Sequence, residues 1–279
     1  MSAKTARQNR QQPTGQPSKC IFCGNEGNMS KQHIWPNWLK DVYPRDSGSH
    51  IYENYGLSTI NRKPEYYDSS KKRNGHQGTS KVRRICVACN GGWMSRIENC
   101  MKSVFSSLLL DESVIINLTN QLLLSNWAVM ATIVSEYAED GRVSISETDR
   151  SLLYVNQLPP NGWTVWIAKN GGPKWKLQRY HNRKIALPDQ LIDFGNGIQP
   201  MHFNSQLAIF GRDLTLITCK IPWSDYQMRF EGGIGNELVQ IYPSVTQSID
   251  WNKCVAINDS EIEILFDYFK FKLTNGQLI

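Results

Sequence analysis

Two pairs of cysteines constrain this chain of 279 residues more than any other feature. Each pair has the spacing C-x-x-C, with Cys20 and Cys23 in the first and Cys86 and Cys89 in the second. A C-x-x-C turn directs both sulfur atoms at one ion, and two such turns complete the tetrahedral shell of a structural zinc, with Zn–S distances of about 2.3 Å. The 62 residues between the pairs exceed the usual spacing of a zinc ribbon, so we expect a segment inserted between the two turns.

Two other interpretations of the cysteines fit the sequence less well. Disulfides would suit a secreted protein, but the first 19 residues are polar, without the apolar run of a secretory signal, and the seven cysteines are an odd number. A thioredoxin-like redox pair predicts one C-x-x-C beside a βαβ pattern rather than two. We therefore predict a structural Zn²⁺, and we expect the other three cysteines, Cys100, Cys219 and Cys254, to be reduced.

Positive charge is concentrated in the N-terminal part of the chain. Residues 1–110 hold 17 Lys and Arg against 7 Asp and Glu, whereas residues 111–279 hold 14 against 18. The steepest stretch contributes eight basic side chains: Arg62, Lys63, Lys71, Lys72, Arg73, Lys81, Arg83 and Arg84. Such a stretch either contacts a polyanion or forms a solvated basic loop, and charge alone favours neither.

The pattern of apolar residues predicts an α+β protein with an antiparallel sheet. We expect a short strand ending at His33, a basic strand over 81–85 and an amphipathic helix from Trp93 onward, where apolar residues recur at intervals of four. A second helix over 119–140 is so apolar that it should be buried. The later expected elements are a helix over 147–157 capped by Ser146, strands over 163–168, 174–179, 206–210, 214–221 and 237–242, and a last helix from Ser260 to about residue 271.

These elements predict three parts. They are a disordered polar tail (1–19), a zinc module with a basic insertion (20–110) and an α+β domain of unknown role (111–279). No segment is apolar enough for the roughly 20 residues of a membrane-spanning helix, so we expect no membrane contact and a cytoplasmic location.

The residues beside the cysteine pairs resemble a known family. The sequence Gln-His-Ile-Trp-Pro-Asn-Trp-Leu occupies residues 32–39, and Cys-Val-Ala-Cys-Asn-Gly-Gly-Trp-Met-Ser occupies residues 86–95. A zinc-binding turn, an acidic-His-x-x-Pro element and a C-x-x-C followed by His or Asn at the start of a helix form the pattern of HNH endonucleases. More narrowly, the two motifs look like those of a group of bacterial and phage HNH proteins. The resemblance covers roughly residues 20–105 and implies a zinc-stapled ββα-metal module.

The resemblance implies a role for each motif residue. The four cysteines take the structural zinc positions, and His33 takes the position of the general base that removes a proton from the attacking water. Asn90 and Gln32 take the positions that hold a catalytic Mg²⁺ or Mn²⁺, which would stabilise charge on the phosphate. Two simpler roles stay open: Asn90 could cap the helix, and His33 could be a turn histidine bonded to the backbone.

The chain departs from the family pattern at its metal site. The family has Asp, Glu or His before the catalytic His, whereas a neutral Gln32 oxygen binds a hard dication more weakly than a carboxylate does. The inserted segment offers possible replacements for that ligand: Asp46, His50, Glu53 and His76. The family's middle Asn has only loosely spaced counterparts: Asn54, Asn61 and Asn74. The three tryptophans of the motifs, Trp35, Trp38 and Trp93, are expected in the core rather than as base-stacking platforms.

Three functions follow, in this order. The first is a metal-dependent endonuclease that hydrolyses DNA, with the basic stretch on the phosphate backbone; RNA would suit the same chemistry. Its context would be phage or mobile-element DNA processing or antiphage defence, and the C-terminal domain could recognise DNA, form a homodimer or bind a protein partner. The second is a nucleic-acid-binding module on a catalytically inactive HNH scaffold. The third is a structural or assembly protein whose zinc only stabilises the fold.

Overall fold

The computed structural model combines helices with sheets that are antiparallel apart from one short strand pair. This confirms the α+β class predicted from the sequence. The residues described are 19–42, 49–60, 63–74, 79–138, 143, 145–173, 179–185, 191–193, 198–200, 202–210, 213–220, 230 and 233–267. The predicted tail therefore lies outside the described residues except for Lys19, which forms a β-bridge with Glu26.

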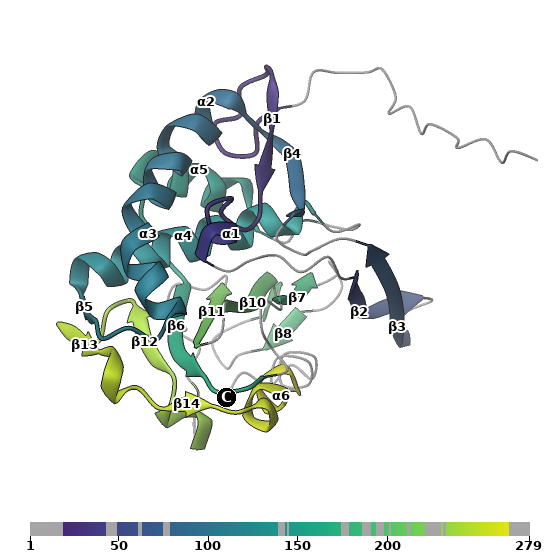
Figure 1. Cartoon of the computed structure of the whole chain (residues 1–279). Coiled ribbons are helices and arrows are strands. Elements are labelled where there is room, and N and C mark those ends of the chain that lie inside the picture. Colours follow the sequence, from purple (N-terminus) through teal and green to yellow (C-terminus); the bar gives the residue numbers. More distant parts are fainter. Residues whose placement is uncertain are drawn as a thin grey trace, which may run out of the picture.

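Two antiparallel strands and a helix form the part of the fold that holds the cysteine pairs, and they lie together in Figure 1. Strand β1 (Met29–His33) pairs with β4 (Lys81–Cys86), as the sequence predicts. The chain then continues through a short turn of helix, α2 (Val87–Cys89), and a π-helical turn, η2 (Asn90–Met94), into α3 (Ser95–Leu109). The helical region therefore begins at the second cysteine pair itself, earlier than the predicted start at residue 93. Both cysteine pairs thus lie at the same end of this strand–strand–helix unit.

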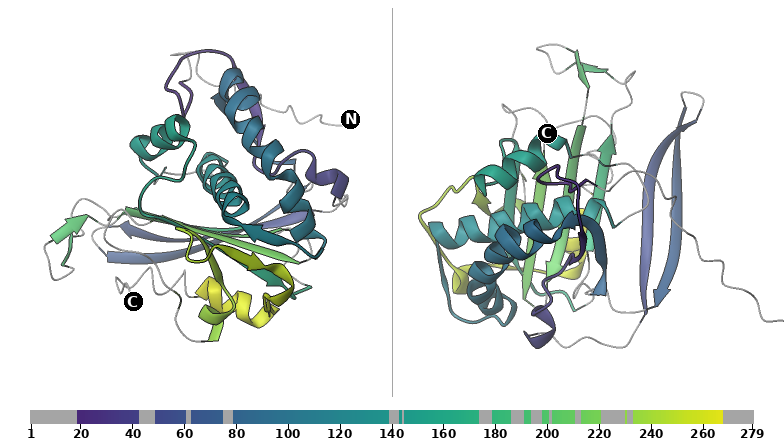
Figure 2. Two further views of the ribbon diagram at one scale, coloured as in Figure 1. Left: turned by 90° about the vertical axis from the view of Figure 1, so that its left-hand side faces the viewer. Right: turned by 90° about the horizontal axis from the view of Figure 1, so that it is seen from above.

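The segment inserted between the cysteine pairs contains a β-hairpin. Strand β2 (Ser49–Ile60) pairs along its whole length with β3 (Lys63–Asn74). Figure 2 (right) shows the hairpin as a separate two-stranded ribbon beside the larger sheet. Its tyrosines and β-branched residues favour strands, whereas the charge pattern predicted only a basic insertion here.

A six-stranded sheet dominates the rest of the chain. Its order is β12-β6-β11-β10-β7, and β14 pairs parallel to β6. The strands are β6 (Trp163–Asn170), β7 (Arg179–Ile185), β10 (His202–Phe210), β11 (Leu214–Lys220), β12 (Val239–Tyr242) and β14 (Ala256–Ile257). Four of the five predicted strands are confirmed, while the fifth, over 174–179, lies outside the described residues apart from its last residue.

Small elements complete the described fold. Two further strand pairs are β5 (Ile115–Asn117) with β13 (Ser248–Asp250), and β8 (Leu191–Asp193) with β9 (Ile198–Pro200). The remaining helices are α1 (Leu39–Val42), α4 (Leu118–Glu136), α5 (Glu147–Asn156), η3 (Gly233–Asn236), η4 (Trp251–Lys253) and α6 (Asp259–Asp267). No helix in the described part of the chain is long and apolar enough to cross a membrane.

Helix α4 is the centre of the core, as its apolar sequence predicts. Every residue over 124–136 is buried. Trp127 contacts Phe105 of α3 with ring centroids 4.9 Å apart, and the Thr132 hydroxyl lies 2.7 Å from that of Thr218 on β11. Figure 2 (left) shows α4 between α3 and the sheet, with α6 on the opposite face of the sheet. One hydrophobic cluster therefore runs from the cysteine pairs through α4 to the sheet, across the predicted boundary at residue 110.

Local polar contacts set where the later helices begin. The Ser146 hydroxyl accepts a hydrogen bond from the backbone N–H of Asp149 at 3.0 Å, which confirms the predicted cap of α5. Helix α6 starts slightly earlier than predicted, because Asn258 caps it and the Glu261 carboxylate accepts the Asn258 N–H in return. This reciprocal pairing is a capping box.

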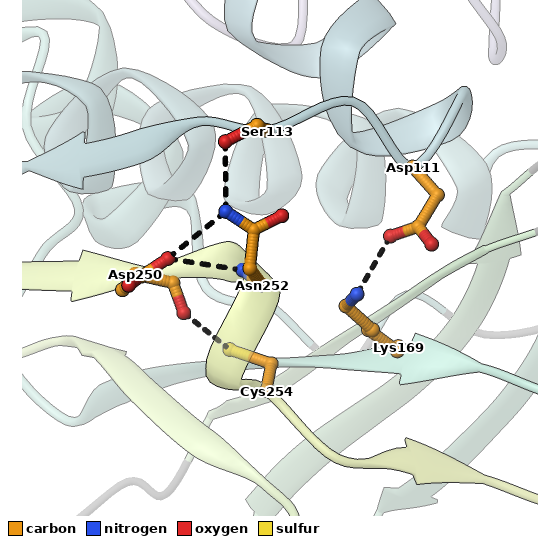
Figure 3. Close-up of polar contacts among 6 residues, drawn as sticks. All are labelled: Asp111, Ser113, Lys169, Asp250, Asn252 and Cys254. Atoms are coloured by element: carbon orange, nitrogen blue, oxygen red, sulfur yellow. Dashed lines mark hydrogen bonds and ion pairs between the residues drawn. The ribbon is translucent and has the colours of Figure 1, made fainter.

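A polar cluster fastens the end of α3 to the sheet (Figure 3). Lys169 on β6 forms an ion pair of 2.8 Å with Asp111, and the Asn252 amide donates to the Ser113 hydroxyl at 2.7 Å. The Lys169 ammonium also lies 5.6 Å from the ring centroid of the buried Trp251. The helical part and the sheet are thus joined by polar contacts at their rim as well as by the shared core.

The buried hydroxyl pair between α4 and β11 predicts an asymmetric mutational response. The Thr132 hydroxyl donates to the Ala128 carbonyl at 2.8 Å, so in the pair it is Thr218 that donates to Thr132. Thr132→Val leaves the Thr218 donor buried without an acceptor and should lower the free energy of unfolding by about 1–3 kcal/mol. The Thr132→Val/Thr218→Val double variant should recover part of that loss, which denaturant unfolding measures. A double variant less stable than Thr132→Val would contradict this account of the contact.

Candidate metal centre and adjoining polar site

The four predicted cysteines converge on one point. Their sulfur atoms all lie within 4.8 Å of one another, and the sulfurs of Cys23 and Cys86 are 3.8 Å apart. A tetrahedral shell with Zn–S bonds of about 2.3 Å places its sulfurs at about 3.8 Å. None of the four forms a disulfide, and Cys23 is the least buried. The cluster can therefore hold a structural metal ion such as zinc, and within the described residues it is the one group of three or more His, Cys, Asp or Glu side chains placed to do so.

Backbone contacts between the two cysteine pairs hold them in register. The N–H of Ile21 donates to the Arg84 carbonyl, and the N–H of Val87 donates to the Asn28 carbonyl, each at 3.0 Å. Gly24 closes the first turn at φ +72°, a left-handed conformation that glycine adopts without strain. The metal centre thus sits where β1 and β4 are already joined by hydrogen bonds.

The thiols differ in their ease of ionisation. Burial raises the pKa of Cys20, but backbone hydrogen bonds, the largest from Cys86, outweigh it and lower the pKa to about 7. Burial raises the pKa of the Cys89 thiol, and the Trp93 indole opposes that rise. Because zinc binds the thiolate form, binding at neutral pH must release protons, and the apparent affinity should rise with pH.

Aromatic and cationic side chains connect the metal centre to α5. Trp93 packs edge-on against Phe22, with centroids 5.0 Å apart, and Tyr154 of α5 lies 6.1 Å away on another side. Arg150, also on α5, donates from Nε to the Ile21 carbonyl at 3.0 Å. The predicted core role of the motif tryptophans is confirmed, since Trp35 and Trp93 are buried and Trp38 is half-buried against the core.

Gln32 and His33 end strand β1 on the side of the module away from the cysteines. Gln32 is 5% exposed, and its Nε2 donates both to the His33 carbonyl at 2.9 Å and to Oε1 of Glu98 on α3 at 3.1 Å. Burial raises the pKa of the Glu98 carboxyl, and the Gln32 hydrogen bond opposes that rise. Glu98 is not among the site residues predicted from the sequence. Glu98 lies on one helix face with the buried residues Met94 and Met101. The sequence signal that could have identified it is therefore an acidic residue within the apolar face of a predicted helix.

Asn90, in the π-helical turn η2, contacts β1 near the start of that strand. Its amide donates to the Ser30 hydroxyl at 2.9 Å, and that hydroxyl donates to the Ile85 carbonyl. The side chain that caps the helical region is Cys86, whose sulfur accepts the N–H of Cys89. The alternative role of Asn90 as a helix cap is therefore wrong: it ties the π-helical turn to β1.

The basic residues lie in two places. Lys81, Arg83 and Arg84 are exposed on β4, and the pairing register sets Lys81 opposite His33. Four others belong to strand β3 of the hairpin: Lys63, Lys71, Lys72 and Arg73. Arg62 lies outside the described residues, as do Asp46, Asn61 and His76; His50, Glu53 and Asn54 belong to β2, and Asn74 ends β3.

Comparisons with protein-family models, with curated proteins and with solved structures find no match to this chain. The assignment of function therefore rests on the site itself.

The cysteine cluster predicts one tightly held zinc for each chain. Cys89→Ser removes a buried ligand and should abolish zinc retention and the cooperative unfolding transition, since structural zinc sites of small domains contribute on the order of 10 kcal/mol. Metal analysis by mass spectrometry, together with thermal unfolding, measures both. Cys100→Ser is the matched control, because Cys100 is exposed and lies outside the cluster. Full zinc retention in Cys89→Ser would contradict the four-cysteine centre.

Proposed function

We propose that this protein is a metal-dependent endonuclease of the HNH type that hydrolyses phosphodiester bonds in DNA. The observation that carries the proposal is the position of His33: it ends β1, beside Gln32 and opposite the exposed Lys81, in a strand–strand–helix unit joined by a four-cysteine centre. An imidazole whose pKa is near neutrality is suited to take a proton from water at a phosphate.

Each neighbour of His33 has a part in this proposal. Lys81 and Arg83 project from the same exposed side of β4 and would hold the phosphates on either side of the cleaved bond. A Mg²⁺ or Mn²⁺ ion held at Gln32 would stabilise the charge that builds on the phosphate and on the leaving oxygen. Asn90 is already engaged with Ser30, so in the proposed site it supports β1, and it would have to give up this hydrogen bond to bind the ion directly.

A nucleic-acid-binding module on an inactive scaffold is the second candidate. Gln32 favours it, because this neutral side chain is already bonded to Glu98 and to the backbone. Under this alternative the basic strand β4 binds nucleic acid, and a divalent ion has no effect. The third candidate, an assembly protein stabilised by zinc, has the cysteine centre in its favour and leaves the exposed basic strand without a role.

The first test is plasmid nicking by the zinc-loaded protein with Mg²⁺ or Mn²⁺. His33→Ala removes the base and should lower the nicking rate by about 10²–10⁴-fold. His202→Ala on β10 is the matched control, and zinc content is measured in both. Gln32→Asp should increase nicking, because a carboxylate binds the dication more strongly. Metal-dependent nicking that persists at full rate in His33→Ala would exclude the proposed base, and absence of nicking with zinc bound would favour the binding module.

The basic strand predicts how binding depends on salt. Lys81→Ala and Arg83→Ala should each weaken binding to a DNA duplex of any sequence and reduce the slope of log K against log salt by about one. Fluorescence anisotropy over a salt series measures this. Lys253→Ala is the control, since this lysine is 83% exposed on η4, outside the zinc module. An unchanged slope in the double variant Lys81→Ala/Arg83→Ala would show that the phosphate contacts are not made by β4.

A further inference from the structure

Glu98 is a half-buried carboxylate that hydrogen-bonds to a neutral side chain, Gln32. It lies on α3, on the face that also presents the fully buried side chains of Met94 and Met101. Among the residues that the structure describes, no Lys or Arg forms an ion pair with it, and its one hydrogen-bond partner is the Gln32 amide. Withdrawing a carboxylate from water without a compensating charge costs free energy, so this position favours a cation.

The location of Glu98 is equally informative. The Gln32 amide that donates to Glu98 also donates to the His33 carbonyl, so one side chain joins the carboxylate to the end of β1. Gln32 and Glu98 are the polar groups at which α3 meets that strand end, whereas Asn90 meets the strand at Ser30. The carboxylate thus lies at the end of β1 that carries His33, and it is linked through the Gln32 amide to the His33 backbone carbonyl.

We propose that Glu98 and Gln32 together form a divalent-cation site for Mg²⁺ or Mn²⁺ beside His33. This inference deepens the proposed function and rests on it for its role. Mg²⁺ in proteins is usually held by one or two carboxylates and completes its octahedral shell with waters and substrate phosphates, so two protein oxygens suffice. A rotation of the Gln32 amide by half a turn presents its Oε1 instead of Nε2 to the ion. The negative charge lacking at Gln32 is then supplied by α3.

The first experiment measures Mn²⁺ binding to the zinc-loaded full chain by electron paramagnetic resonance, without DNA. The wild type should bind one Mn²⁺, and Glu98→Gln should weaken that binding at least about tenfold, because even outer-shell partners of metal ligands contribute about 10–100-fold. The Glu98→Gln amide can still accept the Gln32 hydrogen bond, so a merely structural contact survives. Glu112→Gln is the matched control, since Glu112 is exposed and bonded to Ser107. Equal Mn²⁺ affinities in the wild type and Glu98→Gln would overturn the proposal.

A second variant adds charge at the same place. Gln32→Glu sets two carboxylates about 3 Å apart, and such like-charge pairs are held together by a shared cation or proton. The measurement is made at pH 7.5, about three units above the ordinary pKa of Glu, so that both carboxyl groups favour the ionised form. In metal-free buffer the melting temperature of Gln32→Glu should be lower than that of the wild type. Addition of Mn²⁺ should raise the melting temperature of the variant by more than it raises that of the wild type. Loss of stability that Mn²⁺ does not restore would show a structural hydrogen bond and overturn the site.

The two proposals fail in different ways. Mn²⁺ binding that depends on Glu98, without nicking by the wild type, would keep the cation site and exclude the nuclease. Metal-dependent nicking that Glu98→Gln retains at the wild-type rate would keep the nuclease and exclude Glu98 from its metal site.

Discussion

The convergence of four thiols on one point is the contact on which the N-terminal half of the molecule depends. The two cysteine pairs are 62 residues apart, and the entropic cost of closing such a loop grows only slowly with its length. An insertion as large as the β2–β3 hairpin is therefore tolerated. Three of the four cysteines are buried in the core, and a cation such as zinc, shared by the four sulfurs, would add to the free energy that keeps them together.

That contact extends into the rest of the molecule through α3, α4 and α5. Helix α3 continues from the second cysteine pair and packs through Phe105 onto Trp127 of the buried helix α4. Arg150 of α5 is bonded to the first cysteine pair at Ile21. The cysteine cluster is therefore connected by direct contacts to α4 and α5, whereas the sheet contributes none of the residues of the proposed active site.

The sequence predicted the elements that have a local pattern, but it did not predict the features that depend on tertiary contacts. The cysteine spacing identified the metal cluster, and the apolar run over 119–140 identified α4, because both patterns have few alternative structures. The β2–β3 hairpin was missed since its strand-forming residues are mixed with charges that suggest a loop. Glu98 was missed because a glutamate on an amphipathic helix normally faces water, and only the packing of α3 on β1 reveals that this one faces Gln32.

The same geometry explains how one centre can organise a site that it does not touch. Strand β1 and helix α3 both extend from the cysteine cluster, so the positions of Gln32 at the end of the strand and of Glu98 in the first turn of the helix are set relative to the four sulfurs. In the proposed site the backbones of β1 and α3 need not move when an ion or a phosphate arrives, and the reorganisation is confined to the rotation of the Gln32 amide. A neutral glutamine beside His33 is then compatible with a cation site, provided that the charge comes from the facing helix. In the proposed function, the four thiols would hold β1 and α3 together, Glu98 of α3 would supply the charge for the cation, and the exposed strand β4 would contact the polyanion.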